Sequence, residues 1–176
     1  MIHIPKKLDT RRSHRIIQFF LKRSESWSKE GRDFSIYWSA AHMTTTAQIM
    51  RLLAISRGLD ADICAIAGAI HDVATMETGR QENHAVKSLD FIDALISEYN
   101  AGNEKYKITG AEIAILKEII PQHSDKDVVS DNLYAETLKD ADAIDRYLHG
   151  VETKEHEIPR LVKALSAMGI EAEFRQ

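Results

Sequence analysis

Apolar side chains recur along most of the chain at intervals of three and four residues, which is the spacing of amphipathic helices. The clearest stretch predicts a helix that ends before Gly58, with one face formed by Ile36, Ala40, Met43, Ala47, Met50 and Ala54. Asp60 can cap a second helix, which has no charged side chain from Ile63 to Ile70 and ends at His71-Asp72. A buried carboxylate needs a strong partner, so this dipeptide either lies at the end of the helix by chance or marks a place where a cation binds.

The other segments also have helical periodicity. We expect an amphipathic helix over 11–27, one from about Asn83 to Tyr99, and a last one from Pro159 to near Gly169. Thr109 and Glu112 have the spacing of a capping box, and the helix they open should end or kink at Pro121. A further helix starts near Ser130 or Asp131 and stops at Gly150, and its expected inward residues are Leu138, Ala141, Ile144 and Leu148. We find no strand or hairpin signal, so the predicted fold is all-α.

The composition fits one soluble, helix-rich domain. The chain has 176 residues, of which 44% are hydrophobic and 28% are charged, and this length accommodates a single sizeable core. We therefore divide it into an N-terminal covering segment (1–35), a core (36–150) and a C-terminal helix packed on that core (151–176).

Charge and cysteine content narrow the class of protein. The net charge of -4 gives no general attraction to nucleic acid, although residues 6–23 are locally basic. The single cysteine, Cys64, has apolar neighbours and is expected to be buried. The chain shows neither an apolar signal core at its start nor a membrane-spanning run, so we expect a cytoplasmic protein with no membrane association. The sequence does not indicate an oligomeric state.

Four of the eight histidines lie at or beside apolar helical faces: His42, His71, His84 and His123. A single histidine in such a place is more often a hydrogen-bonded structural residue. Together with carboxylates, however, several imidazoles on packed helices supply the donors that divalent metals prefer. Asp140 and Asp142 both flank the apolar face of their helix, and periodicity alone does not choose between them. An exposed acidic helix edge is the alternative explanation for that pair.

The order of these segments resembles the HD-domain superfamily of metal-dependent phosphohydrolases, over roughly residues 36–149. The matching stretches are AAHMTTTAQIMRLL, AIAGAIHDVAT, ENHAVKSLDFI, IIPQHSDK and LKDADAIDRYL. The resemblance implies a helical bundle of about six to seven helices. It also implies metal ligands at His42, His71, Asp72 and Asp142, the last chosen over Asp140 by the Ala-Asp-x-Ile pattern.

Two further histidines, His84 and His123, fall where histidine-rich branches of the superfamily place ligands for a second metal. The overall order is most similar to the branch that includes diadenosine tetraphosphate hydrolases, in which the aspartate at Asp72 typically bridges two ions. Two other branches fit less well. Thr75 stands where the deoxynucleotide 5'-monophosphatases have glutamate, and the Gly-Tyr-Pro and His-His-Glu segments of the cyclic dinucleotide phosphodiesterases are missing.

The resemblance implies hydrolysis of a phosphate ester or anhydride of a nucleotide or small metabolite. The cofactor would be one or two divalent transition metals (Fe, Mn, Co, Ni or Zn), with His71 and Asp72 as the catalytic pair. Cations near the expected ligands in sequence are candidate substrate-binding residues: Arg80, Lys126 and Arg146. Two alternatives remain, a non-catalytic or regulatory module that binds a nucleotide or metal, and a structural domain with incidental histidines.

Overall fold

The computed structural model describes residues 7–172, and in this range it is built from helices and contains no strand. The longer helices are α1 (Arg11–Ser24), α2 (Ile36–Arg57), α3 (Ala61–Ile70), α6 (Leu89–Ala101), α7 (Gly110–Ile119), α8 (Leu133–Leu148) and α9 (Ile158–Ala167). Short helices are α4 (Val73–Thr78), α5 (His84–Lys87), η1 (Glu104–Tyr106), η2 (Ile120–Gln122) and η3 (Glu155–Glu157). The all-α prediction is confirmed, and seven of the described helices have ten or more residues.

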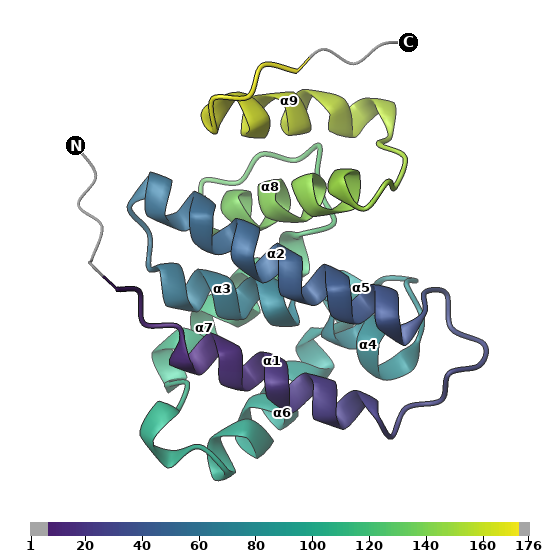
Figure 1. The fold of residues 1–176 in the computed structure, drawn as a ribbon, viewed down its shortest axis with the longest axis vertical. Coiled ribbons are helices and arrows are strands. Elements are labelled where there is room, and N and C mark those ends of the chain that lie inside the picture. The colour runs from purple at the N-terminus through teal and green to yellow at the C-terminus, as the bar shows by residue number, and fades with distance from the viewer. Residues whose placement is uncertain (1–6, 173–176) are drawn as a thin grey trace.

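Helix α2 is the central element. It packs along α3 on one side and α8 on another, while α1 lies against α3 and α9 lies on α8 (Figure 1). One continuous core of buried apolar side chains joins these helices. Helices α1 and α9 thus cover opposite sides of the bundle, as expected for covering segments. The predicted boundaries 1–35 and 151–176 include residues 1–6 and 173–176, which lie outside the described residues. The domain boundaries stay a prediction.

The helix ends follow local chemistry. The side chain of Asp60 accepts hydrogen bonds from the backbone of Asp62 and Ile63 at the start of α3. Thr109 and Glu112 form the predicted capping box of α7, which ends at Ile119 before Pro121. Helix α9 has proline in its first turn, as predicted.

Cys64 is fully buried, as expected, and burial raises the pKa of its thiol to about 12.

Three details differ from the sequence-based prediction. The helix expected from Asn83 to Tyr99 is interrupted at Ser88, because this buried hydroxyl bonds the backbone carbonyls of His71 and His84, and such bonds compete with regular helix. Helix α8 begins at Leu133, since Asn132 rather than Ser130 or Asp131 caps it. Leu148 is 68% exposed instead of buried, because the last turn of α8 runs beyond the core. None of the described helices is long and apolar enough to cross a membrane.

Candidate metal centre

Five separate segments bring a cluster of histidines and aspartates together inside the bundle. His42 comes from α2, His71 and Asp72 from the junction of α3 and α4, His84 from the start of α5, His123 from the end of η2, and Asp142 from α8. All are buried except His84, which is partly buried. We call these six residues the candidate metal centre.

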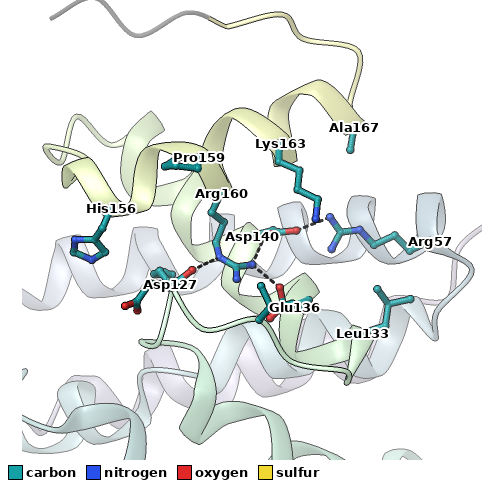
Figure 2. Close-up of a pocket in the computed structure, with 12 residues that line it drawn as sticks. Arg57, Asp127, Leu133, Glu136, Asp140, His156, Pro159, Arg160, Lys163 and Ala167 are labelled. Carbon is teal, nitrogen blue, oxygen red and sulfur yellow. Dashed lines mark hydrogen bonds and ion pairs between the residues drawn. The ribbon is translucent and has the colours of Figure 1, made fainter.

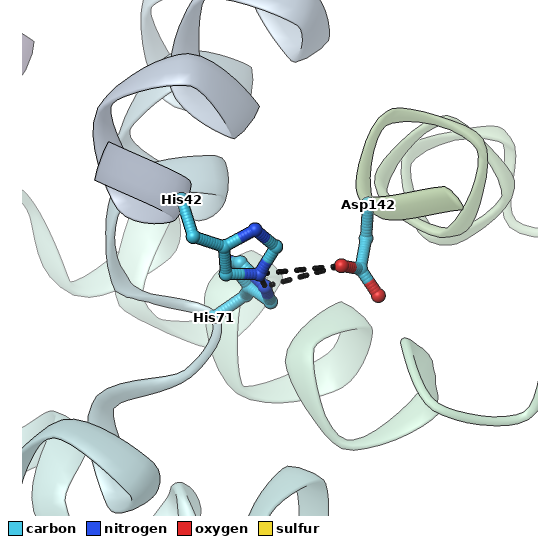
Figure 3. A group of neighbouring side chains, drawn as sticks. All are labelled: His42, His71 and Asp142. Atoms are coloured by element: carbon cyan, nitrogen blue, oxygen red, sulfur yellow. Dashed lines mark hydrogen bonds and ion pairs between the residues drawn. The ribbon is translucent and has the colours of Figure 1, made fainter. Parts of the chain in front are cut away.

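Potential ligand atoms fall into two overlapping groups, each with all its atoms within 4.8 Å of one another. The first group is His42, His71 and Asp142, whose side chains point toward one another (Figure 3). The second is His71, Asp72 and His123. The arrangement therefore offers donors for more than one ion, with His71 lying between the two groups.

Backbone carbonyls fix the orientation of three imidazoles. The Nδ1 atoms of His71, His84 and His123 lie 2.8, 2.7 and 2.7 Å from the carbonyl oxygens of Gly68, Gln81 and Ile120. A carbonyl oxygen only accepts hydrogen bonds, so each Nδ1 carries a proton, and each ring in its neutral form presents its Nε2 lone pair to the cluster. Nδ1 of His42 likewise faces a carboxylate, that of Asp145.

The Nε2 atoms of the four histidines lie in two close pairs. Nε2 of His42 lies 3.1 Å from Nε2 of His71, and Nε2 of His84 lies 2.9 Å from Nε2 of His123. Two lone pairs at this separation repel unless positive charge lies between them. Each pair thus requires either a proton or a metal ion.

Asp72 faces both histidine pairs. Its Oδ1 lies 3.1 Å from Nε2 of His84 and 3.2 Å from Nε2 of His123, while its Oδ2 lies 3.6 Å from Nε2 of His42. Although Oδ1 is buried, it has no well-formed hydrogen bond among the described residues. A buried carboxylate oxygen without such a bond, surrounded by imidazole nitrogens, fits a metal ligand.

The electrostatics fit the same interpretation. Burial alone would raise the pKa of Asp72, but His71 and hydrogen-bonding contacts with His123 and His42 hold that pKa well below its usual range. Burial lowers the pKa of His123 to about 4. His42 and His84 behave oppositely. Burial opposes their charge, yet neighbouring carboxylates raise both pKa values, chiefly Asp142 for His42 and Asp72 for His84.

The two candidate aspartates of α8 have different surroundings. Asp142 faces the cluster, with Oδ1 3.3 Å from Nε2 of His42, and its Oδ2 accepts a hydrogen bond from the buried ammonium of Lys126. Asp140 instead forms ion pairs with Arg57 and Arg160. The structure therefore brings Asp142, and not Asp140, to the histidines.

The structure also reveals supporting residues that sequence reasoning missed. Asp145 is fully buried and accepts hydrogen bonds from His42 and Thr45. Ser88 ties the backbone of His71 to that of His84. The sequence could have indicated Asp145, because it lies three residues after Asp142 and polar residues one helical turn apart lie on one face of a helix.

The three predicted substrate-binding cations have different environments. Arg146 and Lys126 line a cavity of about 170 Å³ that opens onto the centre, together with Gln81, Ser124, Lys154 and Glu157. Arg80 lies at the surface, where its side chain is 64% exposed and pairs with Asp33. Lys126 is engaged by Asp142. Of the three, Arg146 is the one that lines the cavity without a described ion pair.

Comparison with known families agrees with this geometry. Residues 40–147 match the HD domain, and the match covers more than half of the chain, so the chain belongs to the HD domain family. That family implies a divalent metal at the histidine and aspartate cluster and membership of the metal-dependent phosphohydrolase superfamily. No curated protein and no solved structure matches the chain.

Proposed function

We propose that this protein is a metal-dependent phosphohydrolase that cleaves a phosphate ester or anhydride of a small phosphorylated metabolite, in particular a nucleotide. The observation that carries the proposal is the convergence of four Nε2 atoms and the carboxylates of Asp72 and Asp142 in one buried cluster. A structural domain with incidental histidines has no need of such a costly arrangement of facing lone pairs.

The ligand set divides between two ions. His42, His71 and Asp142 would hold the first ion, and His84 and His123 the second. Asp72 would contribute to holding both, because its Oδ1 lies near His84 and His123 and its Oδ2 lies near His42. A single Nε2 atom binds one ion, so His71 serves the first site only. Imidazole and carboxylate donors suit Fe, Mn, Co, Ni or Zn.

A bound divalent metal supplies Lewis acidity that activates water near neutral pH and offsets charge on phosphoryl oxygens. The side chains of the protein would position the substrate and the metal ligands. His71 and Asp72 are the proposed catalytic pair, and of the two Asp72 lines the cavity and would face the reacting groups. Arg146 and Lys154 at the cavity wall would hold the phosphate oxygens, and Lys126 would orient Asp142 without binding substrate.

The size of the cavity favours a terminal or bridging phosphate group rather than a whole nucleotide inside it, because about 170 Å³ is less than a typical pocket for a drug-sized ligand. The base and sugar would then lie outside. The similarity to the branch with diadenosine tetraphosphate hydrolases supports phosphoanhydrides as the first substrates to examine. We place this activity in the cytoplasm.

Elemental analysis with a substrate panel tests the proposal. Wild-type protein, His71→Ala and His84→Ala would be purified under identical conditions, reconstituted with Mn²⁺ and assayed for phosphate release from nucleotides, dinucleoside polyphosphates and phosphomonoesters. We expect about two ions in the wild type, loss of metal and turnover in His71→Ala, and a reduced content in His84→Ala. Absence of metal from the reconstituted wild type would overturn the proposal.

A second candidate function is a binding or regulatory module without turnover. The ion pair of Lys126 with Asp142 favours it, because an ammonium already neutralises one proposed ligand. Metal-loaded protein that binds a nucleotide tightly but releases no product from the whole panel would support this alternative.

A further inference from the structure

A second cavity lies between α8 and α9, apart from the candidate metal centre. Its volume is about 660 Å³, within the range of small-molecule sites. The end of α2, the loop after η2, the first half of α8 and the length of α9 all contribute side chains to it (Figure 2). Helix α9 lies beyond residues 40–147, so one wall of this groove is not part of the matched HD domain.

Apolar side chains also line the groove, and they are Val129, Leu133, Pro159 and Ala167. Val129 is 78% exposed and Leu133 47% exposed. Exposed apolar side chains beside a cavity of this size favour a ligand with an apolar body.

The polar floor of the groove is formed by charged side chains, most of which pair with one another. Asp140 accepts from Arg57 and Arg160, and Arg160 also pairs with Glu136. Arg57 is further held by the hydroxyl of Thr137. These charged side chains are only partly exposed, so the floor is rigid and oriented by mutual contacts.

Lys163 is the exception among these cations. It reaches from α9 toward Arg57 and Asp140 (Figure 2), and it has no ion pair or hydrogen bond within residues 7–172. At this end of the groove Arg57, Arg160 and Lys163 face only two carboxylates, those of Glu136 and Asp140. The remaining positive charge favours an anionic group. The carboxylate of Asp127 lies at the opposite end, beside His156 (Figure 2).

The groove is separated from the metal centre by Lys126. This residue lines both cavities, but its ammonium is held by Asp142 and the carbonyl of His123, and its own carbonyl accepts from Arg160. Lys126 is therefore not available to a ligand in the groove, and the other cations that line the two cavities are different residues.

We propose that the groove between α8 and α9 binds a small amphipathic anion, with its acidic head at Lys163 and Arg57 and its apolar body against Leu133 and Val129. This site does not depend on the proposed hydrolase function. The head is a carboxylate or a phosphate, since both are matched by an ammonium beside a guanidinium.

Fluorescence titration with 8-anilinonaphthalene-1-sulfonate, an amphipathic anion, tests the proposal. We expect saturable binding at one site, weakened about tenfold by Lys163→Gln. Leu133→Asp should weaken it similarly by placing an anion on the apolar wall, and this change is compatible with folding because Leu133 is the first residue of α8, where an acidic residue suits the helix dipole. Lys22→Gln, which alters an exposed lysine on α1, is the matched control.

Displacement of the probe then identifies the head group. Octanoate or octyl phosphate should displace it, and whichever is more effective defines the acid, while the uncharged octanol should not. The site would be excluded if neither Lys163→Gln nor Leu133→Asp weakened binding, if Lys22→Gln weakened it as much, or if octanol displaced the probe equally. Metal-stripped protein and His71→Ala should bind the probe like the wild type, so loss of the metal centre does not affect this result.

Discussion

At the scale of single residues, the tautomer of each imidazole is set by what its Nδ1 atom contacts. Three of the rings are fixed by backbone carbonyls, which the fold supplies whatever the side chains nearby. His42 depends on a side chain instead, because its Nδ1 contacts the buried carboxylate of Asp145. This makes Asp145 the most direct test of how the centre is organised.

Asp145→Asn should weaken metal binding by about 10- to 100-fold while helix content stays unchanged. The amide keeps the shape of the carboxylate but can donate to Nδ1 of His42, which moves the ring proton to Nε2 and removes a ligand lone pair. Calorimetric titration of metal-stripped protein with Mn²⁺ measures the effect. Asp140→Asn is the matched control on the same helix, since Asp140 contacts Arg57 and Arg160, and it should leave metal affinity nearly unchanged. Equal affinities for Asp145→Asn and the wild type would show that Asp145 has no role in ligand orientation.

Cys64 gives a second prediction at this scale. With its pKa at about 12, the thiol is almost entirely protonated at pH 8, and only the thiolate reacts with iodoacetamide. Native protein should therefore remain unmodified by mass spectrometry, whereas protein unfolded in guanidinium chloride should be alkylated completely. Rapid alkylation of the native form would mean that α3 opens readily or that Cys64 is less buried than observed.

At the scale of helices, the contact between α2 and α3 determines the distance between His42 and His71. Gly68 allows this contact. A Cβ atom at position 68 would lie 2.9 Å from Cα of Ala47 and 3.0 Å from the carbonyl oxygen of Thr46, which are backbone atoms that cannot move aside cheaply. Gly68 also supplies the carbonyl that orients His71.

Gly68→Ala should lower the free energy of unfolding by about 1–3 kcal/mol and also weaken metal binding, because the added methyl group forces the two helices apart. Urea denaturation and Mn²⁺ titration measure the two effects. Gly110→Ala is the control, since a Cβ there meets nothing within 4 Å, and this exchange should be neutral or slightly stabilising. An unchanged unfolding free energy for Gly68→Ala would show that the helices can separate without cost.

How far the sequence predicts this molecule depends on whether the deciding interactions are local. The capping box of Thr109 and Glu112 and the turn at Pro121 were predictable, because neighbouring residues determine them. The break at Ser88 was not, because it depends on the carbonyl of His71, a contact made only once α3 and α5 are packed. The four histidines were visible as a set, but the pairing of their Nε2 atoms and the role of Asp145 required the tertiary structure.

At the scale of the whole molecule, five segments distant in sequence meet at the candidate metal centre, so ion binding and folding stability are coupled. An ion that binds only the folded state stabilises it in proportion to the logarithm of its free concentration over the dissociation constant. Metal-stripped protein keeps the same contacts only if protons replace the ions between the histidine pairs. The raised pKa values of His42 and His84 indicate where those two protons reside.

Metal binding should therefore release protons and weaken as the pH falls. A histidine whose pKa is raised stays protonated to higher pH, and a protonated ring cannot bind a metal ion. Each proton that the ion must displace therefore lowers the metal affinity about tenfold for every unit of pH below that pKa. His123, with its pKa lowered to about 4, stays neutral between pH 6 and pH 8 and contributes nothing to this dependence.

The increase in melting temperature caused by Mn²⁺ should thus be smaller at pH 6 than at pH 8. Calorimetric titrations in buffers of different ionisation enthalpy count the released protons, with about one expected per ion. A metal-induced stabilisation that is the same at both pH values, with no proton release, would mean that the ions bind elsewhere and that the facing nitrogen pairs are not the metal centre.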